Sequence, residues 1–298
     1  MTFEAHDERF WDVIAADAVI EPLVPGLGIT EGTIWHPRDN YLVFSDLSSS
    51  TLYKWTQQGG ASVVRKPSNI TNGNFIDRSG CIISCEHASS CISRIDAGGR
   101  YIRVLASHYQ GKEFNSPNDI ICDSRGRIWF TDPLYGRTSA RVGVAREPQL
   151  GFQGVFRLEI DGTVTLIADD FAQPNGLCLT PQENALLVND TSRDHIRYFE
   201  VQDDGQVTGG DVFANISGSG PGKPDGMKVD MVGRVYCTGP GGIHVLTSSG
   251  AMLGVITMPA NTRNFCFGDS HFRTLFLAVD EVICRVSLKV QGVAPHML

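Results

Sequence analysis

The sequence predicts an all-β fold, a six-bladed β-propeller with four antiparallel strands in each blade. Three observations carry this prediction: a strand pattern that recurs six times, a high content of turn-forming residues, and tight hairpin signals between short apolar runs. Among 298 residues, 32 are glycine and 14 are proline, which favours many short strands over long helices. Hydrophobic residues at 42% and charged residues at 19% are typical of a globular chain.

The recurring pattern defines the blades. Each copy begins with an acidic or amide residue, continues as an apolar strand, turns, and ends with a second apolar strand. A hairpin-like strand pair follows, for example around Asp161 and Gly162, where glycine supplies the positive φ of a tight turn. The copies are 41, 46, 57, 50 and 39 positions apart, near the length of a propeller blade. Their leading residues are Glu31, Asn72, Asn118, Asn175, Asp225 and Asn264.

The two ends of the chain predict how the ring closes. Residues 18–24 read as an outermost strand that has no blade of its own, whereas the segment 282–288 lacks an outermost strand after it. We therefore expect the N-terminal strand to complete the last blade, so that residues 1–298 form a single propeller domain. Apolar residues such as Phe10 and Trp11 predict a short amphipathic helix over residues 7–16.

Charge and composition exclude several classes of protein. With 25 basic and 33 acidic residues the net charge is −8, which argues against a nucleic-acid partner. The apolar stretch 13–29 is interrupted by Asp17, Glu21 and two prolines, so we expect no membrane segment. The acidic N-terminus is unlike a secretory signal, and the eight cysteines lie mostly as single residues in apolar runs. Free thiols in a reducing, cytoplasmic location are expected, while the oligomeric state is left open.

The leading residues also predict a metal site. The first strand of each propeller blade lines the central channel, so the six leading side chains should converge at one end of it. An all-oxygen ring with two carboxylates suits a hard divalent cation, Ca²⁺ above all. Because amide-rich sites discriminate loosely, Mg²⁺, Mn²⁺ and Zn²⁺ are left open. The plainer alternative is a set of polar residues that solvate a wet channel.

Chain direction places the long connections at the same end as this ring. The connections 107–117, 133–154 and 215–224 should surround a substrate pocket above the ion. The second strands end in Asp46, Glu86, Asp132 and Asp190, which should form an acidic outer shell made mostly of structural turn residues. Glu86 and its neighbour His87 are the pair most suspected of touching substrate. In the third-blade loop, Arg137, Arg141 and Arg146 could meet an anionic substrate or be plain surface charges.

Several motifs carry a family resemblance. Glu-Gly-Thr-Ile-Trp-His-Pro at 31–37, Phe-Asn-Ser-Pro-Asn-Asp at 114–119, Phe-Thr-Asp-Pro at 130–133, Pro-Asn-Gly-Leu at 174–177 and Pro-Asp-Gly-Met-Lys-Val-Asp at 224–230 resemble the gluconolactonase family. That family belongs with regucalcin and luciferin-regenerating enzyme in one six-bladed propeller superfamily. The resemblance runs in order from about residue 20 to 290. One departure is Thr33-Ile34, where the family often has Pro-Val.

The resemblance implies roles for individual residues. The metal ligands would be Glu31, Asn118, Asn175 and Asp225, and Asp225 would also be the general base. Apart from what the resemblance implies, we expect substrate contacts from Asn72, Glu86, His87, Asp119 and Tyr135.

The resemblance also implies a metal-dependent hydrolase that opens a sugar lactone to the hydroxy acid. The cation would polarise the carbonyl group, and Asp225 would activate the water. No Gly-x-Ser-x-Gly motif supports an acyl-enzyme route. Two alternatives are a metal-dependent esterase or phosphotriesterase on the same site, and a non-enzymatic calcium-binding propeller.

Overall fold

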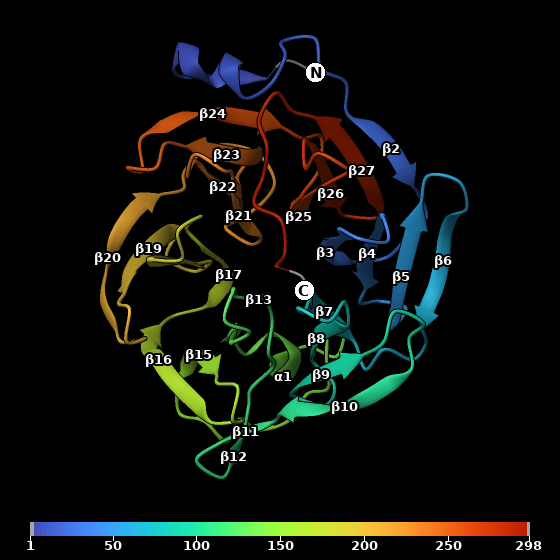
Figure 1. Cartoon of the computed structure of the whole chain (residues 1–298), viewed down its shortest axis with the longest axis vertical. Helices are drawn as coiled ribbons and strands as arrows, with labels where there is room; N and C mark the ends of the chain where they lie inside the picture. Colours follow the sequence, from blue (N-terminus) through green and yellow to red (C-terminus); the bar gives the residue numbers. More distant parts are fainter. Residues whose placement is uncertain (1–2, 297–298) are drawn as a thin grey trace.

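The computed structural model describes residues 3–296, which form a ring of six antiparallel sheets around a central channel (Figure 1). The predicted six-bladed β-propeller is confirmed. In every blade the strand that follows the leading residue lies next to the channel, and the next strands along the chain step outward to the rim. No helix within residues 3–296 is long and apolar enough to cross a membrane.

The strands of each blade follow one another along the chain. The first three blades contain β3 (Thr30–His36), β4 (Tyr41–Asp46), β5 (Thr51–Thr56) and β6 (Gly60–Arg65); β7 (Thr71–Ile76), β8 (Ile82–Glu86), β9 (Cys91–Ile95) and β10 (Tyr101–Ala106); and β13 (Ile120–Cys122), β14 (Ile128–Asp132), β15 (Gln153–Leu158) and β16 (Val164–Phe171). Between the second and third blades, β11 (His108–Tyr109) and β12 (Lys112–Glu113) form a small hairpin.

The remaining blades repeat this order. They contain β17 (Pro174–Leu179), β18 (Ala185–Asp190), β19 (His195–Val201) and β20 (Val207–Asn215); β21 (Met227–Val229), β22 (Val235–Gly239), β23 (Gly242–Leu246) and β24 (Met252–Thr257); and β25 (Thr262–Gly268), β26 (Thr274–Val279) and β27 (Val282–Ser287). The short helix α1 (Tyr135–Thr138) lies in the long loop of the third blade.

The N-terminal segment closes the ring as predicted. Strand β2 (Glu21–Val24) pairs with β27 and is the outermost strand of the sixth blade, where Glu21 lies opposite Arg285 and the two side chains form an ion pair of 2.8 Å. The sequence did not predict β1 (Glu4–Ala5), which adds a fifth strand to the fifth blade by pairing with β24. The expected helix is a shorter 3-10 helix, η1 (Glu8–Asp12), and its Phe10 is fully buried.

Apolar clusters fill the spaces between neighbouring blades. One cluster joins the third and fourth blades through residues such as Trp129, Val155, Leu177 and Leu186. All eight cysteines are free thiols; seven are buried and Cys81 is half-buried, so most behave as the small core residues that the sequence indicated.

Glycine after a leading residue lets the inner strands approach one another closely. A Cβ atom on Gly32, whose φ is +56°, would lie 1.9 Å from the Asn72 carbonyl oxygen. A Cβ atom on Gly176 would lie 1.9 Å from the carbonyl oxygen of Asp225. No other residue fits at either position, because the backbone of the next blade occupies the space. This close approach brings the leading side chains together at one mouth of the channel.

Candidate active site at one mouth of the channel

A pocket of about 300 Å³ opens at the mouth of the channel where the inner strands begin. Five of the six leading residues line it, whereas Asn264 lies just beneath and donates a hydrogen bond of 3.2 Å to Glu31. The pocket therefore brings together all four expected metal ligands and three of the five expected substrate contacts: Glu31, Asn118, Asn175 and Asp225, with Asn72, His87 and Tyr135.

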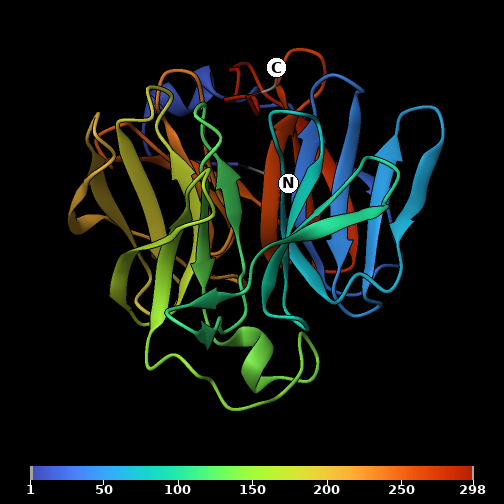
Figure 2. The ribbon, with the colours of Figure 1, turned by 60° about the horizontal axis from the view of Figure 1, so that its bottom comes forward.

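The long loops lie at this end of the ring, as chain direction predicted. Tyr135 and Val142 from the loop 133–154, and Lys223 from the loop 215–224, line the pocket. The loop 107–117 supports the wall from behind instead of lining it. Its Ser116 hydroxyl donates to the Pro133 carbonyl at 2.6 Å and accepts from the Gly136 amide at 2.9 Å. Figure 2 shows α1 at this end of the molecule and the C-terminus at the opposite end.

Buried Glu31 and half-buried Asp225 concentrate negative charge at the mouth of the channel. Burial raises the pKa of Glu31 to about 7, partly offset by attraction to Arg263 and reinforced by repulsion from Asp119. Burial also raises the pKa of Asp225 well above its ordinary value, and the neighbouring charge of Glu31 adds to the effect. Two neighbouring acids that destabilise each other's charged form favour a cation between them.

The amide side chains form a hydrogen-bonded chain around the same mouth. Asn72 donates through Nδ2 to Asn118 Oδ1, and Asn118 Nδ2 donates to Asn175 Oδ1 at 2.7 Å. Asn175 Nδ2 in turn donates to the Thr191 hydroxyl at 3.1 Å and to the Tyr135 hydroxyl at 3.3 Å. The oxygens of Asn118 and Asn175 are thus held within the ring that also contains the two carboxylates.

The donor set fits a hard cation. Within the part of the chain that the structure describes, no three His, Cys, Asp or Glu side chains lie in a group that could hold a metal. A cation here would depend on the amide oxygens of Asn118 and Asn175 as well as on the carboxylates of Glu31 and Asp225. Carboxylate and amide oxygens together suit Ca²⁺ or Mg²⁺, and a divalent ion would offset both charges.

His87 is neutral and fixed in one tautomer. Burial lowers the pKa of His87 to about 4. Its Nδ1–H donates to the Val142 carbonyl oxygen at 2.7 Å, which leaves Nε2 to accept from Asn72 Nδ2 at 3.3 Å. His87 thereby orients Asn72 and, through it, the amide chain.

Side chains from the second strands hold the inner ring in place. Ser45 Oγ donates to the carbonyl of Asn72 at 2.8 Å, and Thr131 Oγ1 donates to the carbonyl of Asn175 at 2.8 Å. Asp225 is held in the same way, because Asn189 Nδ2 donates to its backbone carbonyl at 2.6 Å. The sequence analysis missed these residues, although each stands one position before the acid that ends a second strand.

Two expected substrate contacts lie outside the pocket. The Glu86 carboxylate is buried and accepts from Arg65 at 2.6 Å and Asn69 at 2.8 Å. Asp119 is buried in the channel with Lys228 Nζ 3.9 Å from its carboxylate. The other acids of the expected outer shell cap loops: Asp46, for example, accepts from the amide and hydroxyl groups of Ser49. They are structural turn residues.

The arginines suspected of meeting an anionic substrate do not line the pocket. Arg137 is fully buried, where it pairs with Glu113 at 2.7 Å and donates to the carbonyl of Asn115 at 2.6 Å. Arg146 pairs with the same glutamate, and Arg141 is exposed. The cations that line the pocket are Lys223 and Arg263, which the sequence analysis did not single out.

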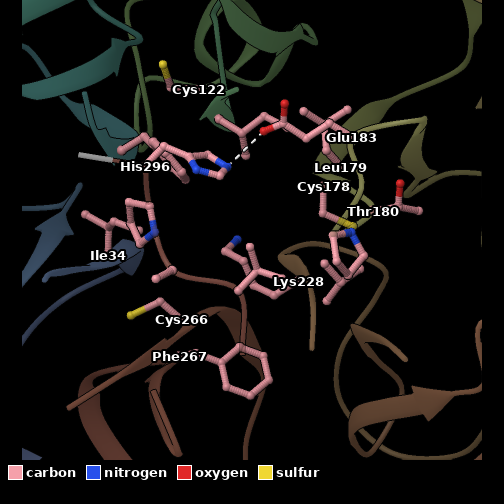
Figure 3. Close-up of a pocket in the computed structure, with 17 residues that line it drawn as sticks. Ile34, Cys122, Cys178, Leu179, Thr180, Glu183, Lys228, Cys266, Phe267 and His296 are labelled. Atoms are coloured by element: carbon pink, nitrogen blue, oxygen red, sulfur yellow. Dashed lines mark ion pairs between the residues drawn. The ribbon is translucent and has the colours of Figure 1, made fainter. Parts of the chain in front are cut away.

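A second cavity, of about 70 Å³, lies toward the other end of the inner strands (Figure 3). The residues three positions after each leading residue line it: Ile34, Phe75, Ile121, Cys178, Lys228 and Phe267. The C-terminal segment covers it, and the His296 side chain forms an ion pair of 2.9 Å with Glu183 (Figure 3). This cavity is small and mainly apolar, so the pocket with the carboxylates is the better candidate.

Comparison with known proteins shows which family the sequence matches. Residues 29–280 match the family described as SMP-30/gluconolactonase/LRE-like region. A gluconolactonase of Zymomonas mobilis is 31% identical over 302 aligned positions, which cover 94% of this chain and 84% of that protein. A pentonolactonase of Haloferax volcanii is 26% identical, over 83% of this chain and 80% of that protein.

Solved structures extend the comparison. A gluconolactonase of Xanthomonas campestris superposes with a TM-score of 0.91 at 31% identity, covering 97% of this chain and 95% of that chain. Regucalcin of Agrobacterium tumefaciens, described as a calcium-binding protein, shares the fold with a TM-score of 0.76 at 15% identity, covering 94% and 97% of the two chains. Because the family match spans most of the sequence and relatives exceed 30% identity, the chain belongs to the SMP-30/gluconolactonase/LRE-like family.

Proposed function

We propose that this enzyme opens the lactone of a sugar acid, with a divalent cation, Ca²⁺ first among them, held by Glu31, Asn118, Asn175 and Asp225. Membership of a family whose named relatives are gluconolactonase and pentonolactonase supports the reaction class. The observation that carries the metal assignment is a pair of carboxylates, buried Glu31 and half-buried Asp225, beside two amide oxygens in a pocket of about 300 Å³.

Different residues of the pocket have different proposed roles in the reaction. When bound, the cation would supply an electrophile for the lactone carbonyl and for the charge that develops on its oxygen. Asp225 accepts the proton of the attacking water, because its carboxylate faces the pocket at the mouth of the channel. Asn72, His87 and Tyr135 line the same pocket and are assigned to hold the hydroxyl groups of the sugar.

The experiment is a lactone panel followed with a pH indicator after chelation and re-addition of single metals. Aldonolactones with five- and six-membered rings are compared with aryl esters and organophosphates. We expect turnover of aldonolactones that is lost on chelation and restored by Ca²⁺ or another divalent ion.

The other outcomes separate the rival functions. Faster turnover of aryl esters or organophosphates would assign the site to an esterase or phosphotriesterase instead. Calcium binding without turnover of any ester would favour a binding propeller. Full lactonase activity after exhaustive chelation would contradict the metal assignment alone.

A further inference from the structure

One wall of the pocket carries positive charge, which a neutral sugar lactone does not require. Arg263 and Lys223 line the pocket together with the two carboxylates. Arg263 stands one position before Asn264, the leading residue of the sixth blade. At the corresponding position of the other five blades the sequence has threonine or proline. The repeat therefore does not require an arginine at this position, which suggests that Arg263 has a function specific to this site.

The guanidinium of Arg263 is incompletely bonded within the protein. Its Nη2 pairs with Asp280 at 3.3 Å, a longer contact than the 2.6 Å pairs of Arg65 or Arg94. With its amide oxygen turned toward the guanidinium, Asn261 accepts from Nη1 and Nη2 at 3.2 and 3.3 Å. The Nε atom is buried and has no hydrogen-bond partner in the protein. Because Nε is buried, a ligand in the pocket would meet the rest of the partly exposed guanidinium, whose Nη atoms make only these long contacts.

Lys223 is a second cation at the pocket, and little free energy is needed to turn its side chain toward a ligand. Its ammonium group lies 3.0 Å from the Asp194 carboxylate, but both side chains are largely exposed. An ion pair in water contributes little, so Lys223 is free to turn toward a ligand in the pocket.

We propose that Arg263, assisted by Lys223, binds an anionic group of the substrate, so that the preferred substrate is a sugar lactone carrying a carboxylate or a similar acidic group. This inference rests on the proposed lactonase function and narrows its substrate class. A guanidinium offers paired donors that match the two oxygens of a carboxylate, and the lysine contributes a point charge.

The competing explanation is that Arg263 only offsets the charge of Glu31 and Asp225. Attraction to Arg263 lowers the pKa of both acids, so the arginine is close enough for such a role. The two explanations differ in what removing the charge should do. A mere counter-charge would affect all lactones alike and would oppose cation binding, whereas an anion-binding group would affect only acidic lactones.

The test compares the γ-lactones of gluconic and glucaric acid, which share a ring and differ in a terminal hydroxymethyl or carboxylate. We expect the wild type to prefer the glucaric lactone. Arg263→Gln should lower kcat/KM for that lactone by about 10- to 100-fold more than for the gluconic lactone, the size of a lost charge-assisted hydrogen bond. Loss of the attraction to Glu31 and Asp225 would affect both lactones alike and would not change this ratio. Arg263→Lys should recover part of the loss, and Lys223→Gln should give a smaller loss of the same selectivity.

Arg141→Gln is the matched control, because it removes the same charge from an exposed position in a loop that lines the pocket. It should change neither lactone. Equal losses on both lactones in Arg263→Gln, or tighter calcium binding with no change of selectivity, would overturn the proposal. So would a wild type that does not prefer the acidic lactone.

A binding measurement keeps this inference separate from the proposed function. Calorimetry with calcium-loaded protein compares glucarate with gluconate, whether or not any lactone is hydrolysed. Tighter binding of glucarate that is lost in Arg263→Gln would support the anion site even if the lactonase function failed. Equal binding of both acids would refute the anion site even if the enzyme were an active lactonase.

Discussion

Glu31 and Asp225 both line the acidic mouth of the channel, but their surroundings differ. Glu31 accepts hydrogen bonds from the Gly32 amide and from Asn264, both at 3.2 Å, which hold its carboxylate in the ring. Asp225 is fixed mainly through its backbone: its amide donates to Thr238 Oγ1 at 2.9 Å. This difference matches the proposed roles, in which Glu31 is a ligand of the cation and Asp225 is both a ligand and the base.

This difference predicts different behaviour of two isosteric variants. Asp225→Asn keeps a ligand oxygen but removes the base, so kcat should fall by about 10² to 10⁴ while much of the bound metal is retained. Glu31→Gln should lose mainly metal affinity, so that a high metal concentration restores part of its rate. Bound metal must be measured on each variant beside kcat, because loss of the ion imitates loss of the base.

Full recovery of Asp225→Asn at high metal concentration would contradict its role as base. It would show that Asp225 only holds the ion and that another group activates the water.

The leading residues of the site were predictable, whereas its cationic wall was not. The leading positions follow from the repeat, because the first strand of each blade lines the channel. Glu86 was misplaced because its partner Arg65 comes from the outer strand of the preceding blade, a contact that no local pattern reveals. Arg263 does stand out in the repeat as the single charge before a leading residue, but its exposure to the pocket depends on how the loops fold.

At the scale of elements, the loop 133–154 is organised by the buried Arg137. Its guanidinium donates to the carbonyl groups of Phe114 and Asn115 and pairs with Glu113, all in the loop 107–117. Its own amide donates to the Leu134 carbonyl at 3.0 Å within α1. One buried side chain thus ties together the two loops that carry and support the pocket wall containing Tyr135.

Arg137→Leu should loosen this wall. It removes the donor to the Phe114 carbonyl, whereas the Asn115 carbonyl keeps Ser90 and the Glu113 carboxylate keeps Arg146 as donors. We therefore expect a loss of about 1–3 kcal/mol in the free energy of unfolding. KM should rise more than kcat falls, because Tyr135 lines the pocket and is proposed to contact the sugar, not the reacting atoms. Urea unfolding and steady-state kinetics measure the two effects.

Arg141→Leu in the same loop is the control and should be close to wild type, since Arg141 is exposed. If Arg137→Leu kept wild-type stability, the loop would be held by its backbone contacts alone.

The strands were largely predictable because alternating apolar residues and turn signals are local. The N-terminal elements β1 and η1 were harder to predict from the sequence. A two-residue strand such as β1 has no pattern of its own and exists only because β24 offers a free edge. The apolar residues of η1 indicated a helix, but its extent is set by packing against the fifth and sixth blades.

For the whole molecule, the N-terminal segment joins the last two blades. It pairs with β24 through β1 and with β27 through β2, and Phe10 between them is fully buried in the shared core. Phe10→Ala should therefore lower the free energy of unfolding by about 3–5 kcal/mol, the usual cost of truncating a buried phenylalanine. Thermal unfolding measures this loss of stability, with Val19→Ala as the control because Val19 is 69% exposed. Equal effects of the two variants would mean that the segment is dispensable for closure.

The expected metal ligands also act at the scale of the ring, since Glu31, Asn118, Asn175 and Asp225 come from four different blades. A cation bound to all four would link these blades in the folded state and would find no such site in the unfolded chain. Calcium at 100 times its dissociation constant should then stabilise the protein by about 2.7 kcal/mol. For a chain of 298 residues this corresponds to a rise in Tm of about 4 °C.

The measurement is thermal unfolding in calcium and in excess chelator, with Glu31→Gln as the comparison. The wild type should lose the stabilisation on chelation, whereas Glu31→Gln should show little response at the same calcium concentration. The variant in chelator should be at least as stable as the wild type in chelator, because it has one buried carboxylate fewer to repel Asp225. A wild-type Tm that does not respond to calcium, magnesium or manganese would place the cation elsewhere than between the blades.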